Sequence, residues 1–242
     1  MSRVPLVLWR KETALALRSR ATWFVLAAVA GLAGVLLVAG LRDAAGHVAQ
    51  LPVVACSQFA MTAPFAVAFF TMGLFARERA SGTLESLLTA PVTDAEVVLG
   101  KFLAAYTLVL LALGLSALSL PVYLHRAAPP PAFAPGHVAW GLGAIALASA
   151  AWTAFGVLAA VAARRESAAG ATTLAFCLST AAFLSEQFPG FRGSELTRLF
   201  DIADFARGVA DTRPLFLFLS CAAFFLFCAV RLLETRRWAS SS

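Results

Sequence analysis

Charged side chains are scarce in this sequence, and its longest apolar stretches contain none. Only 13% of the 242 residues are Asp, Glu, Lys or Arg, whereas 60% are apolar. This composition indicates a membrane protein rather than a soluble one. The absence of ionisable groups from the apolar stretches argues strongly against a proton relay, and less strongly against sodium coupling through hydroxyls and carbonyls. We therefore expect the energy for any transport to come from outside this chain.

Sequence motifs for catalysis are also missing. Gly100 and Lys101 are followed by Phe102 rather than by Ser or Thr, so the phosphate-binding loop of a nucleotide site is not formed. The chain contains neither an HExxH nor a GxSxG pattern, which leaves an intramembrane enzyme without a visible metal site or nucleophile. We therefore expect that the chain is not an enzyme and that it has no catalytic residue.

Cysteine and histidine are few, and their positions favour packing and solvation over chemistry. The cysteines lie in apolar runs without a CxxC pair, so neither a disulfide framework nor a zinc knuckle is indicated. The histidines lie in predicted outer loops, where we expect them to be solvated or interfacial rather than metal ligands. No metal or cofactor site is predicted. The residues concerned are Cys56, Cys177, Cys221 and Cys228, and His47, His125 and His137.

The apolar residues gather into stretches that are long enough to cross a membrane as helices. A span needs about 20 apolar residues, because each residue of a helix rises about 1.5 Å and the hydrocarbon core is about 30 Å thick. We predict an all-α, polytopic protein with one membrane domain over residues 1–242. The six predicted spans are residues 21–41, 52–76, 102–124, 138–163, 168–184 and 214–230.

Basic residues predict the orientation of these spans. With the N-terminus inside, 13 of the 19 Lys and Arg residues lie in inner segments and six lie in outer ones. The positive-inside rule then places both termini in the cytoplasm. Residues 1–20 combine five basic residues with Trp9, which is typical of a helix lying on anionic headgroups at the membrane interface. The net charge of +6 therefore indicates a lipid surface rather than a nucleic acid.

Residues 77–101 form the most polar segment in the first half of the chain. Leu84, Leu87 and Leu88 are spaced as one face of a short helix, and Pro91 ends it. Thr93 and Glu96 then have the spacing of a capping box, so a new helix is predicted to begin there. The apolar stripe would fit a groove on a soluble partner. An ordinary loop followed by a capped helix explains the same residues equally well.

A second polar segment, residues 185–213, precedes the last predicted span. Leu196, Leu199 and Phe200 form one helical stripe, and a second stripe is formed by Ile202, Phe205, Ala206 and Val209. Asp204, Arg207 and Asp211 have ion-pair spacing on the opposite face. We predict one or two short amphipathic helices that enter the outer interface, and we expect Pro214 to be the first residue of the next helix.

These two polar segments resemble those of a known family, the ABC-2-type transporter permeases. The sequence from Phe75 to Lys101 resembles the family's first cytoplasmic loop, with gliding-motility-type permeases and the copper-processing permeases of nitrous-oxide reductase maturation as the nearest look-alikes. In that family the loop carries the coupling helix that docks on the ATPase subunit. The matching residues here are Glu78, Gly82, Thr83, Leu84, Glu85, Leu87, Leu88 and Pro91.

The second segment resembles the family's outer motif. Asp204 stands where the family pattern has a histidine, so the resemblance gives no role to that position. The remaining matches are Phe205, Arg207, Gly208, Val209, Asp211 and Arg213.

The resemblance implies a permease subunit with a type V exporter-like architecture in a bacterial inner membrane. It implies two partners: a separate ATPase subunit, which would hold ATP and magnesium, and a second permease chain, either identical or different. Export of a substrate is the implied activity. A membrane anchor that recruits a soluble factor through residues 77–101 without transport remains the alternative.

Overall fold

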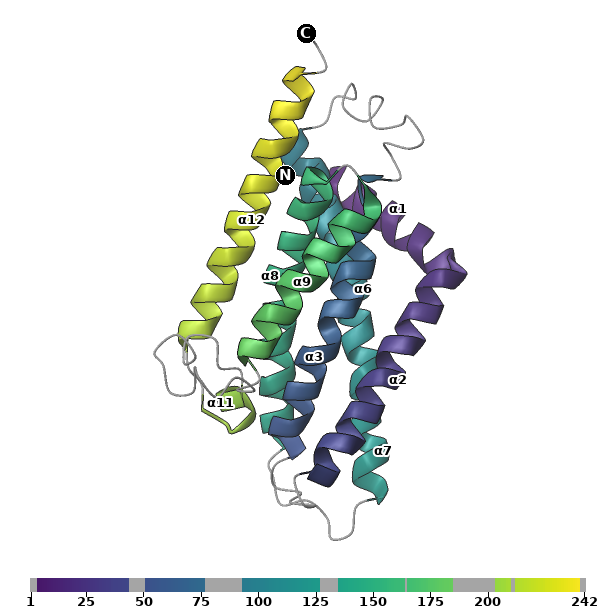
Figure 1. Ribbon diagram of the computed structural model, residues 1–242, viewed down its shortest axis with the longest axis vertical. Helices are drawn as coiled ribbons and strands as arrows, with labels where there is room; N and C mark the ends of the chain where they lie inside the picture. Colours follow the sequence, from purple (N-terminus) through teal and green to yellow (C-terminus); the bar gives the residue numbers. More distant parts are fainter. Residues whose placement is uncertain are drawn as a thin grey trace.

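The computed structural model is helical throughout the residues that it describes. These are residues 4–43, 51–76, 93–126, 135–163, 165–184, 203–209 and 212–239. The long helices stand side by side as one bundle, and α1 lies at an angle beside one end of it (Figure 1). The helices are α1 (Val4–Arg18), α2 (Arg20–Asp43), α3 (Leu51–Met72), α6 (Asp94–Ala117), α7 (Ser119–Arg126), α8 (Pro135–Ala162), α9 (Glu166–Leu184), α11 (Ala203–Ala206) and α12 (Thr212–Ala239).

Five of the described helices are long and apolar enough to cross a membrane. The shortest of the five has 22 residues, and a helix of that length spans about 33 Å. This confirms that the chain is a multi-pass membrane protein. α9 is not among the five, so the predicted count of six spans stays a prediction. The five are Arg20–Arg42, Leu51–Met72, Asp94–Val122, Gly136–Ala162 and Thr212–Thr235.

The helix of the third predicted span begins where the capping box predicts it, since Thr93 is the N-cap and Asp94 is the first residue of α6. Its other end differs from the prediction, because α6 ends at Ala117 instead of continuing to residue 124. Pro121 explains the end, because a proline has no N–H for the carbonyl of Ala117 and its ring clashes there. After the break at Leu118 the chain continues as α7, where Pro121 falls in the first turn.

The last helix is also longer than predicted. α12 begins at Thr212, so Pro214 is its third residue rather than its first, and the helix continues past residue 230 to Ala239. Two histidines assigned to loops lie in helices, since His125 is part of α7 and His137 is part of α8. His47 lies outside the described residues.

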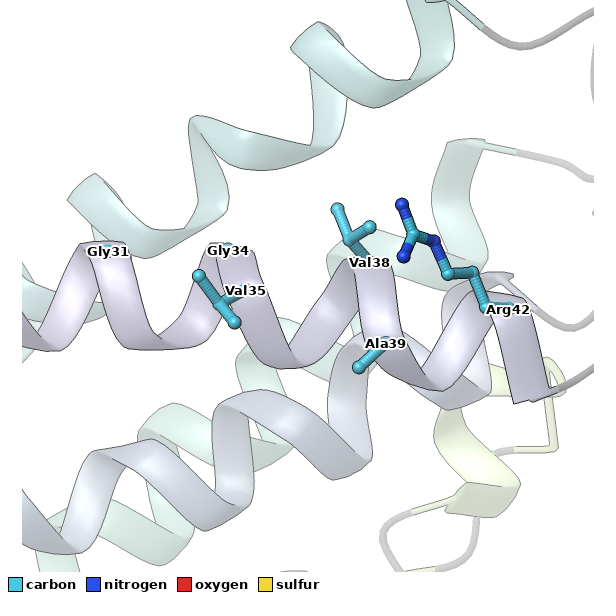
Figure 2. A pocket seen from close by; sticks show the side chains of 6 residues that line it. All are labelled: Gly31, Gly34, Val35, Val38, Ala39 and Arg42. Atoms are coloured by element: carbon cyan, nitrogen blue, oxygen red, sulfur yellow. The ribbon is translucent and has the colours of Figure 1, made fainter.

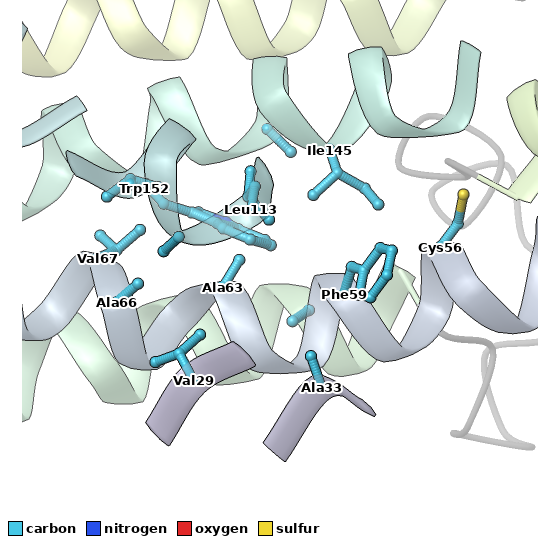
Figure 3. Close-up of a cluster of buried hydrophobic side chains, with 14 of the residues drawn as sticks. Val29, Ala33, Cys56, Phe59, Ala63, Ala66, Val67, Leu113, Ile145 and Trp152 are labelled. Carbon is cyan, nitrogen blue, oxygen red and sulfur yellow. The ribbon is translucent and has the colours of Figure 1, made fainter. Parts of the chain in front are cut away.

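α3 is the central helix of the bundle and contacts α2, α6, α8 and α9. Phe59 and Val67 of α3 and Trp152 of α8 are almost completely buried where these helices meet. Small residues between them, such as Ala63 and Ala33, allow the backbones to approach closely (Figure 3). The centre of the molecule is thus a packed apolar core.

Two glycines of α8 set how it lies against α3. A Cβ atom at Gly156 would lie 2.5 Å from Thr71 Oγ1, and one at Gly141 would collide with Cys56 Sγ. In both contacts the α8 glycine follows its α3 partner by the same number of positions in the sequence. α3 and α8 therefore run parallel to each other in a single register. Close contact at both glycines requires that neither residue has a side chain.

A second apolar cluster closes one end of the bundle. It joins the last turns of α3, α8 and α12 to the first turns of α6 and α9, with Leu8 of α1 packed against it. Figure 1 shows α1 and the last turns of α12 at this end, and α7 and α11 at the opposite end. We call it the hairpin-base cluster: Phe75, Val97, Val98, Val157, Ala160, Val161, Ala169, Ala229 and Leu233.

Candidate functional site

The residues expected to dock on an ATPase lie outside the described part of the chain. They are Glu78, Gly82, Thr83, Leu84, Glu85, Leu87, Leu88 and Pro91, all between residues 77 and 92. The structure describes the two helix ends on either side of this loop, namely the end of α3 and the start of α6. These ends, with the part of α1 that contacts them, form the candidate site.

The start of α6 carries the capping box that the sequence predicts. The hydroxyl of Thr93 accepts a hydrogen bond from the backbone N–H of Glu96 at 3.3 Å. In return, the carboxylate of Glu96 accepts one from the backbone N–H of Thr93 at 3.0 Å. Asp94 adds a negative charge in the first turn, which favours the positive end of the helix dipole. The chain is therefore held in a defined conformation immediately after the loop.

The end of α3 is held by a lysine from α6. The side chain of Lys101 is 1% exposed, although it lies only two turns into the helix. Its Nζ atom donates a hydrogen bond to the backbone carbonyl of Leu74 at 2.7 Å. It also lies 3.8 Å from Glu12 Oε1 of α1 and 5.1 Å from the centre of the Phe75 ring. The ammonium group of this α6 residue therefore contacts two other segments of the chain, α1 and the turn after α3.

The burial of Lys101 was not predicted from the sequence, because residues 77–101 were expected to form the cytoplasmic loop. The helical spacing of residues in α6 did contain a signal for this burial. Lys101 occupies a position of the apolar stripe that α6 turns toward the core, between buried valines one turn before it and buried alanines one turn after it. A charged residue at a core position of such a stripe marks a buried contact rather than a loop end.

α1 packs along α6 instead of lying apart from the bundle. Leu8 rests on Gly100, where an added Cβ would lie 2.9 Å from the leucine side chain. The indole N–H of Trp9 donates to the hydroxyl of Thr107 at 2.9 Å. The apolar side chains of α1 therefore differ in their surroundings, since Leu8 faces α6 whereas Val7 and Leu15 are exposed. An interfacial position for α1 stays a prediction.

The outer motif forms one turn at the opposite end of the bundle. The N–H of Gly208 donates to the carbonyl of Phe205 at 3.1 Å, and the N–H of Val209 donates to that of Asp204 at 2.9 Å. This is a Schellman motif, in which Gly208 has the positive φ of 86° that the turn requires. Arg207 pairs with Asp204 at 2.9 Å, as the spacing predicts.

The turn docks on the bundle through its apolar residues. Phe205 and Ala206 are each 2% exposed, and α11 contacts α3 and α8. Val209, which the sequence placed on the same stripe, is 56% exposed. Arg213 lies in the first turn of α12, and Asp211 lies outside the described residues. The structure therefore brings four of the six motif residues into one turn, at the far end from the candidate site (Figure 1).

A shallow groove runs along the outward face of α2. It is hollow because Gly31 and Gly34 have no side chains, and its remaining walls are apolar apart from Arg42 (Figure 2). Within the described residues, no three His, Cys, Asp or Glu side chains are placed to hold a metal ion. Neither the groove nor the core provides a constellation for catalysis.

The fold defines the class of the protein: a multi-pass helical membrane protein with a packed core and a polar loop between two of its central helices. Comparison with known families identifies the class more closely. The family model for ABC-2 family transporter proteins matches residues 6–189, which is most of the chain, so the protein belongs to the ABC-2 transporter family. A comparison with curated proteins gave no match.

Family membership defines the role of the chain at a coarse level. It is a membrane subunit for transport rather than a catalytic one, and the family implies an ABC ATPase as its partner. The matched region includes the loop at residues 77–92 and ends before α11 and α12. The likeness of the outer motif to that of the family therefore stays a prediction.

Proposed function

We propose that this chain is the permease subunit of an exporter and that a separate ATPase drives it by pushing on residues 77–92. The observation that carries the proposal is the construction of the loop's two ends. One end is a capping box, and the other is a helix terminus joined to α6 by a buried lysine. A force applied to the loop would reach two helices that are fixed to each other.

The position of α3 supports the same mechanism. α3 contacts five other described helices, so a displacement of its end would change the packing of most of the bundle. Closure of the ATPase on ATP would push the loop, and the spans would rock between inward-facing and outward-facing arrangements. The apolar stripe of Leu84, Leu87 and Leu88 would be the surface that the ATPase grips.

A second permease chain completes the proposed transporter. α2 and α12 both present large apolar side chains to the outside of the bundle, including Phe24 and Val35 on α2 and Phe216 and Phe224 on α12. Such faces suit lipid or another membrane helix equally. The partner would be identical or related, and the subtype would be that of the gliding-motility or copper-processing permeases. We place the assembly in a bacterial inner membrane with both termini in the cytoplasm.

Co-purification with an ABC ATPase tests the docking loop. Removing residues 82–91 should abolish co-purification with an ABC ATPase that the unmodified chain retains, and it should leave insertion into the membrane intact. The matched control removes residues 127–134, which separate α7 from α8 in the sequence. Retention of the ATPase by the first variant, or its loss from the control, would show that docking does not depend on this loop.

A non-transporting anchor is the competing function, and reconstitution separates the two. A permease should change the rate at which the ATPase hydrolyses ATP when both are placed in lipid vesicles. An anchor should bind its partner without changing that rate.

A further inference from the structure

Lys101 is the most deeply buried charged side chain among the described residues. Its neighbours on α6 are apolar, and its side chain crosses from α6 to the end of α3. The surface ion pair between Arg231 and Glu234 is different, because its side chains are 65% and 37% exposed. A pair of that kind contributes little to stability, whereas a buried cation must be compensated by its surroundings.

The surroundings of Lys101 provide this compensation from three directions. The carbonyl of Leu74 lies in the turn that follows α3, and it accepts a hydrogen bond from the ammonium group at 2.7 Å. Glu12 supplies a carboxylate, and the Phe75 ring supplies the negative face of an aromatic system. An apolar side chain would fill this position of the stripe without the desolvation cost of a charge. The retained charge therefore indicates a role beyond packing.

That role concerns α1, which packs along α6. The Leu8 contact with Gly100 and the hydrogen bond from Trp9 to Thr107 set α1 against α6. Neither contact reaches α3. The ammonium group of Lys101 contacts both Glu12 of α1 and Leu74 at the end of α3. Together with Leu8, which packs on the hairpin-base cluster that includes Phe75, it ties these segments together beside the loop.

We propose that Lys101 is a positioning residue that holds α1, the end of α3 and the start of α6 as one rigid unit. Displacement of the loop at residues 77–92 then moves α1 together with both helices. The rigid unit itself is a property of this chain alone. Its part in transmitting force rests on the proposed function, in which an ATPase pushes this loop.

Distances between spin labels test the rigid unit without any partner. The labels are placed at Lys11 of α1, which is exposed, and at Ala76, which follows α3 and is half-buried, in the chain with its four cysteines replaced by alanine. In lipid nanodiscs we expect one narrow distance distribution, and we expect K101M to broaden it at least twofold. R231M, which removes an exposed charge at the same end of the bundle, should leave it narrow. An unchanged distribution in K101M would overturn the proposal.

E12Q keeps the test decisive if K101M does not fold. This change removes only the carboxylate on α1, and Glu12 is 22% exposed, so the variant should retain its fold. We expect broadening in E12Q that is smaller than in K101M, because the hydrogen bond to Leu74 remains. A distribution in E12Q identical to that of the unmodified protein would also contradict the rigid unit.

A second arm separates this inference from the proposed function. The unmodified chain, K101M and R231M are each reconstituted with the ABC ATPase used in the co-purification test, and ATP hydrolysis is measured with and without the permease. K101M should still bind the ATPase and should lose about fivefold or more of the change in rate, the lower end of the range for coupling between sites. An equal response in K101M and unmodified protein would overturn the role of Lys101. If the unmodified chain neither binds nor responds, the proposed function fails, and the spin-label result still decides the rigid unit.

Discussion

Single residues decide how closely the helices of this protein approach one another. Gly156 is the clearest case, because three atoms of Thr71 lie within 2.8 Å of the position that a Cβ would occupy. The Thr71 hydroxyl is already engaged by the carbonyl of Val67 at 2.8 Å. The threonine therefore cannot turn away without losing a buried hydrogen bond.

Replacing Gly156 with alanine should destabilise the protein. The added methyl forces α3 and α8 apart, and overpacking of this kind costs about 1–3 kcal/mol. Titration of the purified protein with a denaturing detergent, followed by circular dichroism, measures the change in the free energy of unfolding.

Gly143→Ala is the matched control on the same helix. No atom lies within 4 Å of the position that its Cβ would take. The helix propensity of alanine should leave the free energy of unfolding unchanged or raise it by up to about 1 kcal/mol. A loss of similar size in both variants would show that close packing at Gly156 is not the cause.

The residues of the candidate site were only partly predictable from sequence. Thr93 and Glu96 form the predicted capping box because their hydrogen bonds depend on local spacing alone. Lys101 was misassigned because its burial depends on Leu74 and Glu12, which are distant in the sequence and are brought to it by the packing of α3 and α1.

At the scale of whole elements, the ends of the helices determine how force passes from one segment to the next. The first turn of α6 depends on its cap, because the N–H groups there have no partners within the helix. Thr93→Ala removes the hydroxyl that accepts from Glu96 and should cost about 1 kcal/mol.

Protease sensitivity in the loop measures this effect. Fraying of the first turn should increase the rate of limited proteolysis between residues 77 and 92, whereas the global unfolding transition should shift only slightly. Ser220→Ala is the control, since its exposed hydroxyl bonds only within its own helix. Equal cleavage rates in the two variants would contradict the role of the cap.

α11 is an element whose position depends on one glycine. Gly208 has a positive φ, and a Cβ there would lie 2.6 Å from the imidazole of His137. Gly208→Ala should therefore strain the turn by about 1–3 kcal/mol and loosen α11 from α3 and α8.

Thiol labelling reports the loosening. Cys56 is buried against Gly141 of α8, and the buried Ala206 of α11 lies next to the same glycine, Gly141. A maleimide reagent should react with Cys56 faster in Gly208→Ala than in the unmodified protein. Gly136→Ala, near the same end and with no atom within 4 Å, should leave the rate unchanged. Unaltered labelling in Gly208→Ala would show that α11 does not cover Cys56.

At the scale of the whole molecule, the mechanism requires that the hairpin-base cluster lies at the cytoplasmic end of the bundle. α1 and the last turns of α12 lie at the same end of the bundle as the hairpin base (Figure 1). We therefore expect a cysteine at Ser86 and one at the C-terminus to be protected from an impermeant thiol reagent in whole cells. A cysteine at Ala132 should react. Labelling of residue 86 from outside the cell would end the proposal that an ATPase drives this chain.

The sequence by itself determined that this chain is a helical, multi-pass membrane protein. Long stretches without charge can satisfy their backbone in a membrane only as helices or as a closed barrel, and local spacing is enough to set a cap or a turn. Only the tertiary structure decided which helices touch. It placed α3 at the centre, seated α8 on it through two glycines and buried Lys101 between three segments. These outcomes depend on contacts between residues far apart in the chain, which no local pattern specifies.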